Sequence, residues 1–152
     1  MKIEEKLKAM GAALPAAPPA QGSYVPGVRT GNLIFLSGVG PRKPDGSFIV
    51  GKVGRDLTVE QGQEAARLCA LNLLANLKGL VGDLDRVKRI VKVLGMVNCT
   101  DAFGDQPKVM NGFSDFMVEL FGDRGRHARS AVGMASLPVG IPVEIEMVVE
   151  LE

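Results

Sequence analysis

The fold of this 152-residue chain is decided by two segments near its end, Arg126-His127-Ala128-Arg129-Ser130-Ala131-Val132-Gly133 and Val143-Glu144-Ile145-Glu146-Met147-Val148-Val149. In the second segment apolar side chains occupy every second position, which is the period of a β-strand with one buried face. The first segment runs from an arginine into small residues. A turn containing Pro and Gly separates the two, and we therefore expect two strands joined by this turn, with pairing between them as the simplest arrangement.

Such a pair would bring one arginine and one glutamate together. If the strands are neighbours, Arg129 and Glu144 share a sheet face beside a space that the small residues of the first strand leave open. A guanidinium there can bind a carboxylate with two parallel hydrogen bonds, and a carboxylate can take a proton from water. The ordinary alternative is that both charges are solvated or pair with each other, because charged side chains usually lie at the surface.

Hydrophobic patterning predicts the other elements. They are a short helix (2–10), a Pro-rich connector (14–20), a hairpin (24–37), a short or edge strand (48–53), a helix from the Thr58–Gln61 capping box to about Leu80, a strand (90–98) and a helix (105–122). This order predicts an α+β domain with two helices on one face of a mixed sheet. Apolar side chains also point outward from the predicted strands, which predicts a homo-oligomer built sheet face to sheet face.

Composition narrows the classes of function. The chain is 46% hydrophobic and 23% charged with a formal net charge of +1, so it lacks the basic excess that holds nucleic acid. No apolar run is long enough to span a bilayer, and the acidic N-terminus has no apolar signal core, so we expect a cytoplasmic protein. The two cysteines, Cys69 and Cys99, predict neither a disulfide nor a metal site, and the single histidine argues against His-rich zinc sites. From these residues we expect no metal site.

Several motifs resemble the reactive intermediate deaminase (RidA, YjgF-like) family. The run from Tyr24 to Gly38 is similar to that family's opening hairpin, and the closing motifs are Asn111, 128–130, Leu137-Pro138 and 143–146. The resemblance implies a chorismate-mutase-like single domain, a homotrimer around a central barrel, and a site for a small carboxylate-bearing ligand in each cleft between subunits. Residues 1–22 lie outside the compact family core, as in a long subgroup with a Pro-rich arm, which gives a 1–22 arm and a 23–152 domain.

The resemblance also implies roles for individual residues. Arg129 is similar to the arginine that clamps the substrate carboxylate, and Glu144 resembles the acid that orders the hydrolytic water. The remaining pocket residues implied by the resemblance are Tyr24, Ser37, Gly38, Asn111 and Ala131. Ala131 stands where the family often has Cys.

The expected function follows from the family's better-known members. They hydrolyse enamine and imine intermediates of the 2-aminoacrylate type to 2-keto acids and ammonia, without metal or organic cofactor. Two other classes stay open at this point. One is a non-catalytic carboxylate-binding or chaperone-like trimer that keeps the cleft. The other is an endoribonuclease, which the near-zero net charge and the single histidine disfavour.

Overall fold

The period-two pattern near the end of the chain forms the central strand of the sheet, β5 (Val143–Leu151), whose alternate residues from Val143 on are buried. The computed structural model describes residues 2–17 and 22–152. In this part of the chain one sheet has the strand order β1-β2-β5-β3-β4. The other strands are β1 (Gly27–Thr30), β2 (Leu33–Val39), β3 (Val87–Asn98) and β4 (Ala128–Met134). Segment 48–53, a predicted strand, makes only isolated bridges.

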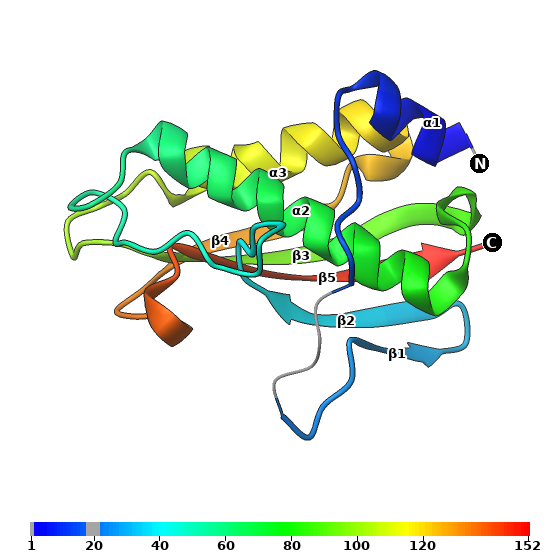
Figure 1. Cartoon of the computed structure of the whole chain (residues 1–152), viewed down its shortest axis with the longest axis horizontal. Helices are drawn as coiled ribbons and strands as arrows, with labels where there is room; N and C mark the ends of the chain where they lie inside the picture. The colour runs from blue at the N-terminus through cyan, green and yellow to red at the C-terminus, as the bar shows by residue number, and fades with distance from the viewer. Residues whose placement is uncertain (1, 18–21) are drawn as a thin grey trace.

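The helices lie together on one face of the sheet (Figure 1). Two of them are the predicted ones, α2 (Val59–Val81), which begins with the expected capping box, and α3 (Gln106–Phe121). They approach closely at Gly112, where a Cβ atom would lie 2.3 Å from the carbonyl oxygen of Gln63. The closeness of the two backbones therefore requires a residue without a side chain at this position.

A third helix joins this layer, where two were expected. It is α1 (Lys2–Ala9), which buries Ile3 and Leu7 and packs against α3 and the 3-10 turn η1 (Leu84–Arg86). The Asp85 carboxylate accepts hydrogen bonds from the backbone N–H groups of Lys2 and Ile3, at 2.8 and 2.9 Å, and so caps the first turn of α1. The predicted connector 14–20 is described as far as residue 17 and lies outside the described residues from 18 to 20.

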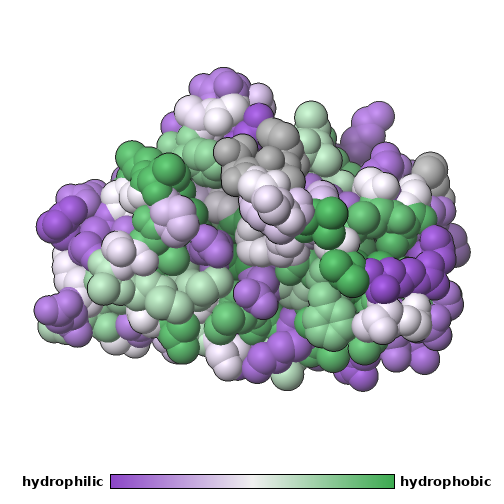
Figure 2. Space-filling model, turned by 90° about the horizontal axis from the view of Figure 1, so that it is seen from below, coloured by the Kyte–Doolittle hydropathy of each residue, from purple (hydrophilic) through white to green (hydrophobic). Residues whose placement is uncertain are grey.

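The face of the sheet opposite the helices carries exposed apolar side chains. Phe35 is 47% exposed and pairs with Val28 on β1 and with Val148 on β5, so the three residues form a row across adjacent strands. Figure 2 shows the molecule from this side, with apolar patches between polar ones. The α+β architecture is confirmed, and the apolar open face is the feature from which an oligomer was predicted.

No helix in the described residues has the length and apolar character that crossing a bilayer requires.

Candidate functional site

The residues predicted for the site fall into two groups on opposite faces of the sheet. Arg129, Asn111 and Ala131 lie on the helical side, where Ala131 packs against the core. Tyr24, Ser37, Gly38 and Glu144 gather around the bulged end of β2 and the open face.

Arg129 is held under α3 by one of its three nitrogens. The residue is second in β4 and lies opposite Val93 of β3, which is fully buried on the helical side. Its Nη1 donates to Asn111 Oδ1 at 2.9 Å and to Ser114 Oγ at 3.1 Å. Both acceptors come from α3, so helix and strand together fix the guanidinium. Within residues 2–17 and 22–152, Nε and Nη2 of Arg129 donate to no protein acceptor, so both of the hydrogen bonds that Arg129 donates come from Nη1.

The predicted pairing of the two closing strands is wrong. β3 lies between β4 and β5, parallel to the first and antiparallel to the second. Arg129 lies opposite Val93, whereas Glu144 lies opposite Met96, three residues farther along β3. Because successive residues of a strand face opposite ways, an odd separation places Arg129 and Glu144 on opposite faces. Within one chain, therefore, guanidinium and carboxylate do not share a sheet face.

Glu144 is half-buried on the open side, against the backbone of β2. A Cβ atom on Gly38 would lie 2.7 Å from Glu144 Oε2, so any side chain at residue 38 would displace the carboxylate from this position. Burial, with the nearby charge of Glu146 as a second cause, raises the pKa of Glu144 above its usual 4.5. In the described part of the chain, the Glu144 carboxylate forms no ion pair. A carboxyl group with a raised pKa is better suited to exchange protons near neutral pH.

Ser37 precedes Gly38 in β2, and its hydrogen bonds reach the segment that carries Tyr24. The Ser37 hydroxyl donates to the Val25 carbonyl at 2.6 Å, and its backbone N–H donates to the Pro26 carbonyl at 2.9 Å. These bonds hold the segment that carries Tyr24 along the β2 bulge, where the register with β5 shifts between Leu36 and Val39. The Tyr24 side chain is 48% exposed. The open-face group is therefore accessible from outside the subunit.

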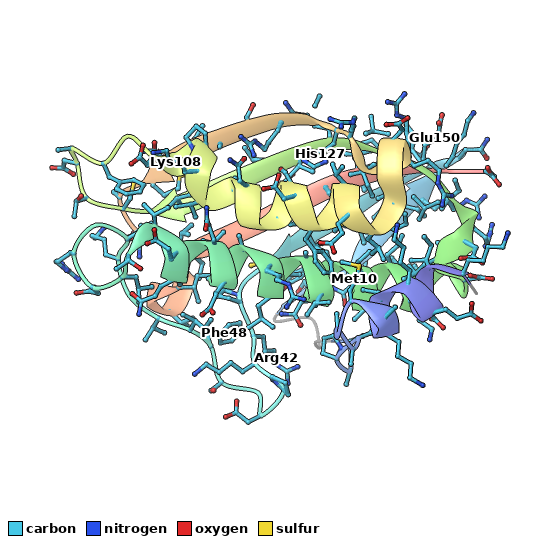
Figure 3. All side chains as sticks on the ribbon, turned by 90° about the horizontal axis from the view of Figure 1, so that it is seen from above. Met10, Arg42, Phe48, Lys108, His127 and Glu150 are labelled. Carbon is cyan, nitrogen blue, oxygen red and sulfur yellow. The ribbon has the colours of Figure 1, made fainter. Side chains whose placement is uncertain are left out.

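Sequence reasoning missed two polar residues beside Arg129, namely Ser114, which accepts from the guanidinium, and His127, which contacts Ser114. Ser114 Oγ lies 2.8 Å from His127 Nε2, and His127 Nδ1 lies 2.7 Å from the Gly125 carbonyl. Burial, followed by the charge of Arg129, lowers the pKa of His127, although the bond to Gly125 opposes the shift. Figure 3 places His127 between α3 and β4. A signal was available, because Ser114 follows Asn111 by three residues on a helix and His127 precedes Arg129 by two before a strand.

A hollow of about 480 Å³ lies elsewhere, between segment 50–56 and the loop around η3 (Pro138–Gly140). Lys52 Nζ donates there to Asn98 Oδ1 and the Ala135 carbonyl, both at 2.7 Å, and to the Cys99 carbonyl at 3.4 Å. An ammonium group has three hydrogens, so these acceptors use all of its donors. The lysine ties the two loops together.

Among the described residues, no three His, Cys, Asp or Glu side chains gather as metal ligands.

Comparison with known proteins places this geometry in a family. The family model described as "YjgF/chorismate_mutase-like, putative endoribonuclease" matches residues 4–151. The chain belongs to the YjgF/RidA family. It therefore shares the chorismate-mutase-like fold that its motifs predicted, and the family match extends into α1.

Individual YjgF/RidA relatives carry different descriptions. Protein TCP17 of Trypanosoma cruzi is 43% identical over 99% of this chain and 94% of its own length. The 2-iminobutanoate/2-iminopropanoate deaminase of Escherichia coli K12 is 33% identical over 87% of this chain and 90% of the enzyme. The crystal structure of Atu1372 from Agrobacterium tumefaciens, titled a protein with unknown function, is 44% identical with a TM-score of 0.92, covering 99% of this chain and 93% of that one. Deaminase activity thus occurs in the family.

Proposed function

We propose that the protein hydrolyses the C=N bond of small 2-imino acids, giving 2-keto acids and ammonia. The observation that carries this proposal is the arrangement of Arg129, whose Nη1 is held by α3 while Nε and Nη2 are left to donate to a ligand. Two donors in one plane suit a carboxylate, which 2-imino acids carry beside the reactive carbon. The E. coli deaminase relative, at 33% identity, supports the same substrate class.

The site is proposed to be shared between two copies of the chain. Arg129 and Glu144 lie on opposite faces of one subunit's sheet, so a ligand held by one is separated from the other by the sheet itself. The open face that carries Glu144 also carries the exposed row around Phe35, which a second subunit can cover. In a closed homotrimer each subunit offers its Arg129 side to one neighbour and its Glu144 side to the other.

The proposed reaction needs only water besides the substrate. Arg129 binds the carboxylate of R–C(=NH)–COO⁻ and fixes the orientation of the adjacent C=N bond. Glu144 takes a proton from water as the water oxygen bonds to the imine carbon, and the nitrogen accepts a proton in turn. The hydroxyl group of the resulting carbinolamine then gives up its proton and the amine nitrogen takes one. The C=O bond forms as the C–N bond breaks, ammonia leaves, and the 2-keto acid remains. The raised pKa of Glu144 makes its carboxylate a stronger base for the proton that it takes from water.

A coupled assay tests the proposal. A dehydratase generates 2-aminoacrylate in solution, and the appearance of keto acid is followed with and without the protein. Faster keto acid formation is expected, and it must be lost in the double variant Arg129→Lys/Glu144→Gln. If wild type leaves the rate unchanged but still binds 2-keto acids, the protein is a carboxylate-binding member without this chemistry.

A further inference from the structure

The guanidinium of Arg129 ends a chain of hydrogen bonds that begins at a backbone carbonyl. In order, the chain joins Gly125 O, His127 Nδ1 and Nε2, Ser114 Oγ, Arg129 Nη1 and Asn111 Oδ1. It links the 3-10 turn η2 (Gly122–Gly125), α3 and β4. Every link is 3.1 Å or shorter, which is ordinary hydrogen-bond geometry.

The direction of each bond follows from which atoms can donate. A carbonyl only accepts, so His127 Nδ1 must carry the hydrogen toward Gly125. In the neutral ring Nε2 then has a lone pair, and the Ser114 hydroxyl donates to it. The Ser114 oxygen is left to accept from Arg129 Nη1, whose second hydrogen goes to Asn111. Both hydrogens of Nη1 are therefore used inside the subunit.

We propose that Ser114 and His127 are positioning residues, which hold Arg129 so that its Nε–Nη2 edge receives the substrate carboxylate; this inference rests on the function proposed above. Without Ser114, Nη1 keeps one acceptor, Asn111, and the guanidinium is free to turn about that single bond. Without the His127 ring, the Ser114 hydroxyl group loses the partner that orients it. Neither residue needs to touch the reacting atoms.

This arrangement couples ligand binding to protonation of His127. A protonated ring donates from Nε2 to the Ser114 oxygen, so Ser114 stays held, and the ring adds a positive charge near Arg129. That charge favours an anion, so carboxylate binding and His127 protonation must strengthen each other reciprocally. Among the described residues, α3 contributes the Ser114 hydroxyl and the Phe113 ring to the surroundings of the imidazole, and η2 contributes the Gly125 carbonyl. Arg129 is the one charged group that acts on the pKa of His127 there.

The single histidine of the chain makes a direct test possible, because ¹⁵N-histidine labelling gives one imidazole to observe by NMR. The full-length protein is titrated with acid, alone and with saturating 2-oxobutanoate. We expect the Nδ1–H tautomer at neutral pH and a pKa below the ordinary 6.5 without ligand, which rises when 2-oxobutanoate binds. Calorimetry with Ser114→Ala should show 2-oxobutanoate binding weakened by roughly three- to tenfold, the ordinary range for one hydrogen bond.

The matched control is Ser136→Ala, in an exposed loop, which should bind like wild type. An Nε2–H tautomer, a His127 pKa that 2-oxobutanoate does not move, or unchanged affinity in a folded Ser114→Ala variant would overturn the inference. If those results occur while Arg129→Lys still loses binding, the proposed function stands and only the positioning role falls. If wild type does not bind 2-oxobutanoate at all, both are overturned.

Discussion

The substitution Arg129→Lys separates the charge of the clamp from its geometry. Lysine keeps the positive charge and most of the stem, but it has one nitrogen where arginine has three. In the structure, one arginine nitrogen is already bonded to Asn111 and Ser114, at 2.9 and 3.1 Å. A lysine ammonium must therefore either replace Nη1 under α3 or turn toward the ligand, and it cannot present two coplanar donors to a carboxylate.

The expected loss follows from one charged hydrogen bond. Such a bond contributes roughly 1.5–3 kcal/mol. That range corresponds to a loss of about tenfold to hundredfold in affinity or turnover. The fold should persist, because Arg129 lies on β4, one of the two edge strands of the sheet in the described residues, and the lysine stem fills most of the same space. Calorimetric titration with 2-oxobutanoate measures affinity, the coupled deamination assay measures turnover, and thermal unfolding checks the fold.

The control for this substitution is Arg67→Lys. Arg67 is an exposed arginine of α2 whose guanidinium lies 5.1 Å from the ring centre of Phe116, on the helical layer. It should bind the keto acid and turn over like wild type. If Arg129→Lys binds 2-oxobutanoate as tightly as wild type does, Arg129 is not the carboxylate clamp and the reasoning about the site is refuted at its first step.

Three further substitutions test other parts of the account. Gly38→Ala should lower kcat by roughly tenfold with little change in Tm, because its Cβ would lie 2.7 Å from the movable Glu144 carboxylate; unchanged kcat would contradict this. Gly112→Ala should destabilise the fold by roughly 1–3 kcal/mol in denaturant unfolding, because its Cβ meets backbone atoms of Gln63. Glu146→Gln removes a negative charge that raises the pKa of Glu144, so the Glu144 carboxylate should persist to lower pH. The acid limb of kcat/KM should then move to lower pH, and an unmoved limb would remove Glu144 as the base.

Local patterns predicted the elements of this fold well. The alternation from Val143 to Leu151 predicted β5, and the Thr58–Gln61 capping box predicted the start of α2. Both signals lie within a few residues of the structure that they specify. The YjgF/RidA motifs likewise predicted the family and its chorismate-mutase-like fold.

The strand order was not predicted, and the reason is physical. Adjacency in sequence suggested that β4 and β5 pair, but β3 lies between them. The units β3, α3 and β4 form a strand–helix–strand crossover, which joins parallel neighbours in a sheet. Applying that rule would have paired β4 with β3 and separated Arg129 from Glu144. The contact of Ser114 with His127 depends on how α3 packs over β4, which no local pattern specifies.

The central claim is that one active site takes Arg129 from one copy and Glu144 from its neighbour, and co-assembly of two inactive variants tests it most directly. Chains carrying Arg129→Lys and chains carrying Glu144→Gln are co-expressed with different tags, and mixed oligomers are purified through both. If the site is shared, one of the three sites in every cyclic trimer that contains both variants has both native residues, so about a third of the wild-type activity should return. If each site lies within one chain, every site keeps one substitution. Mixed trimers no more active than the two parent variants would contradict the account.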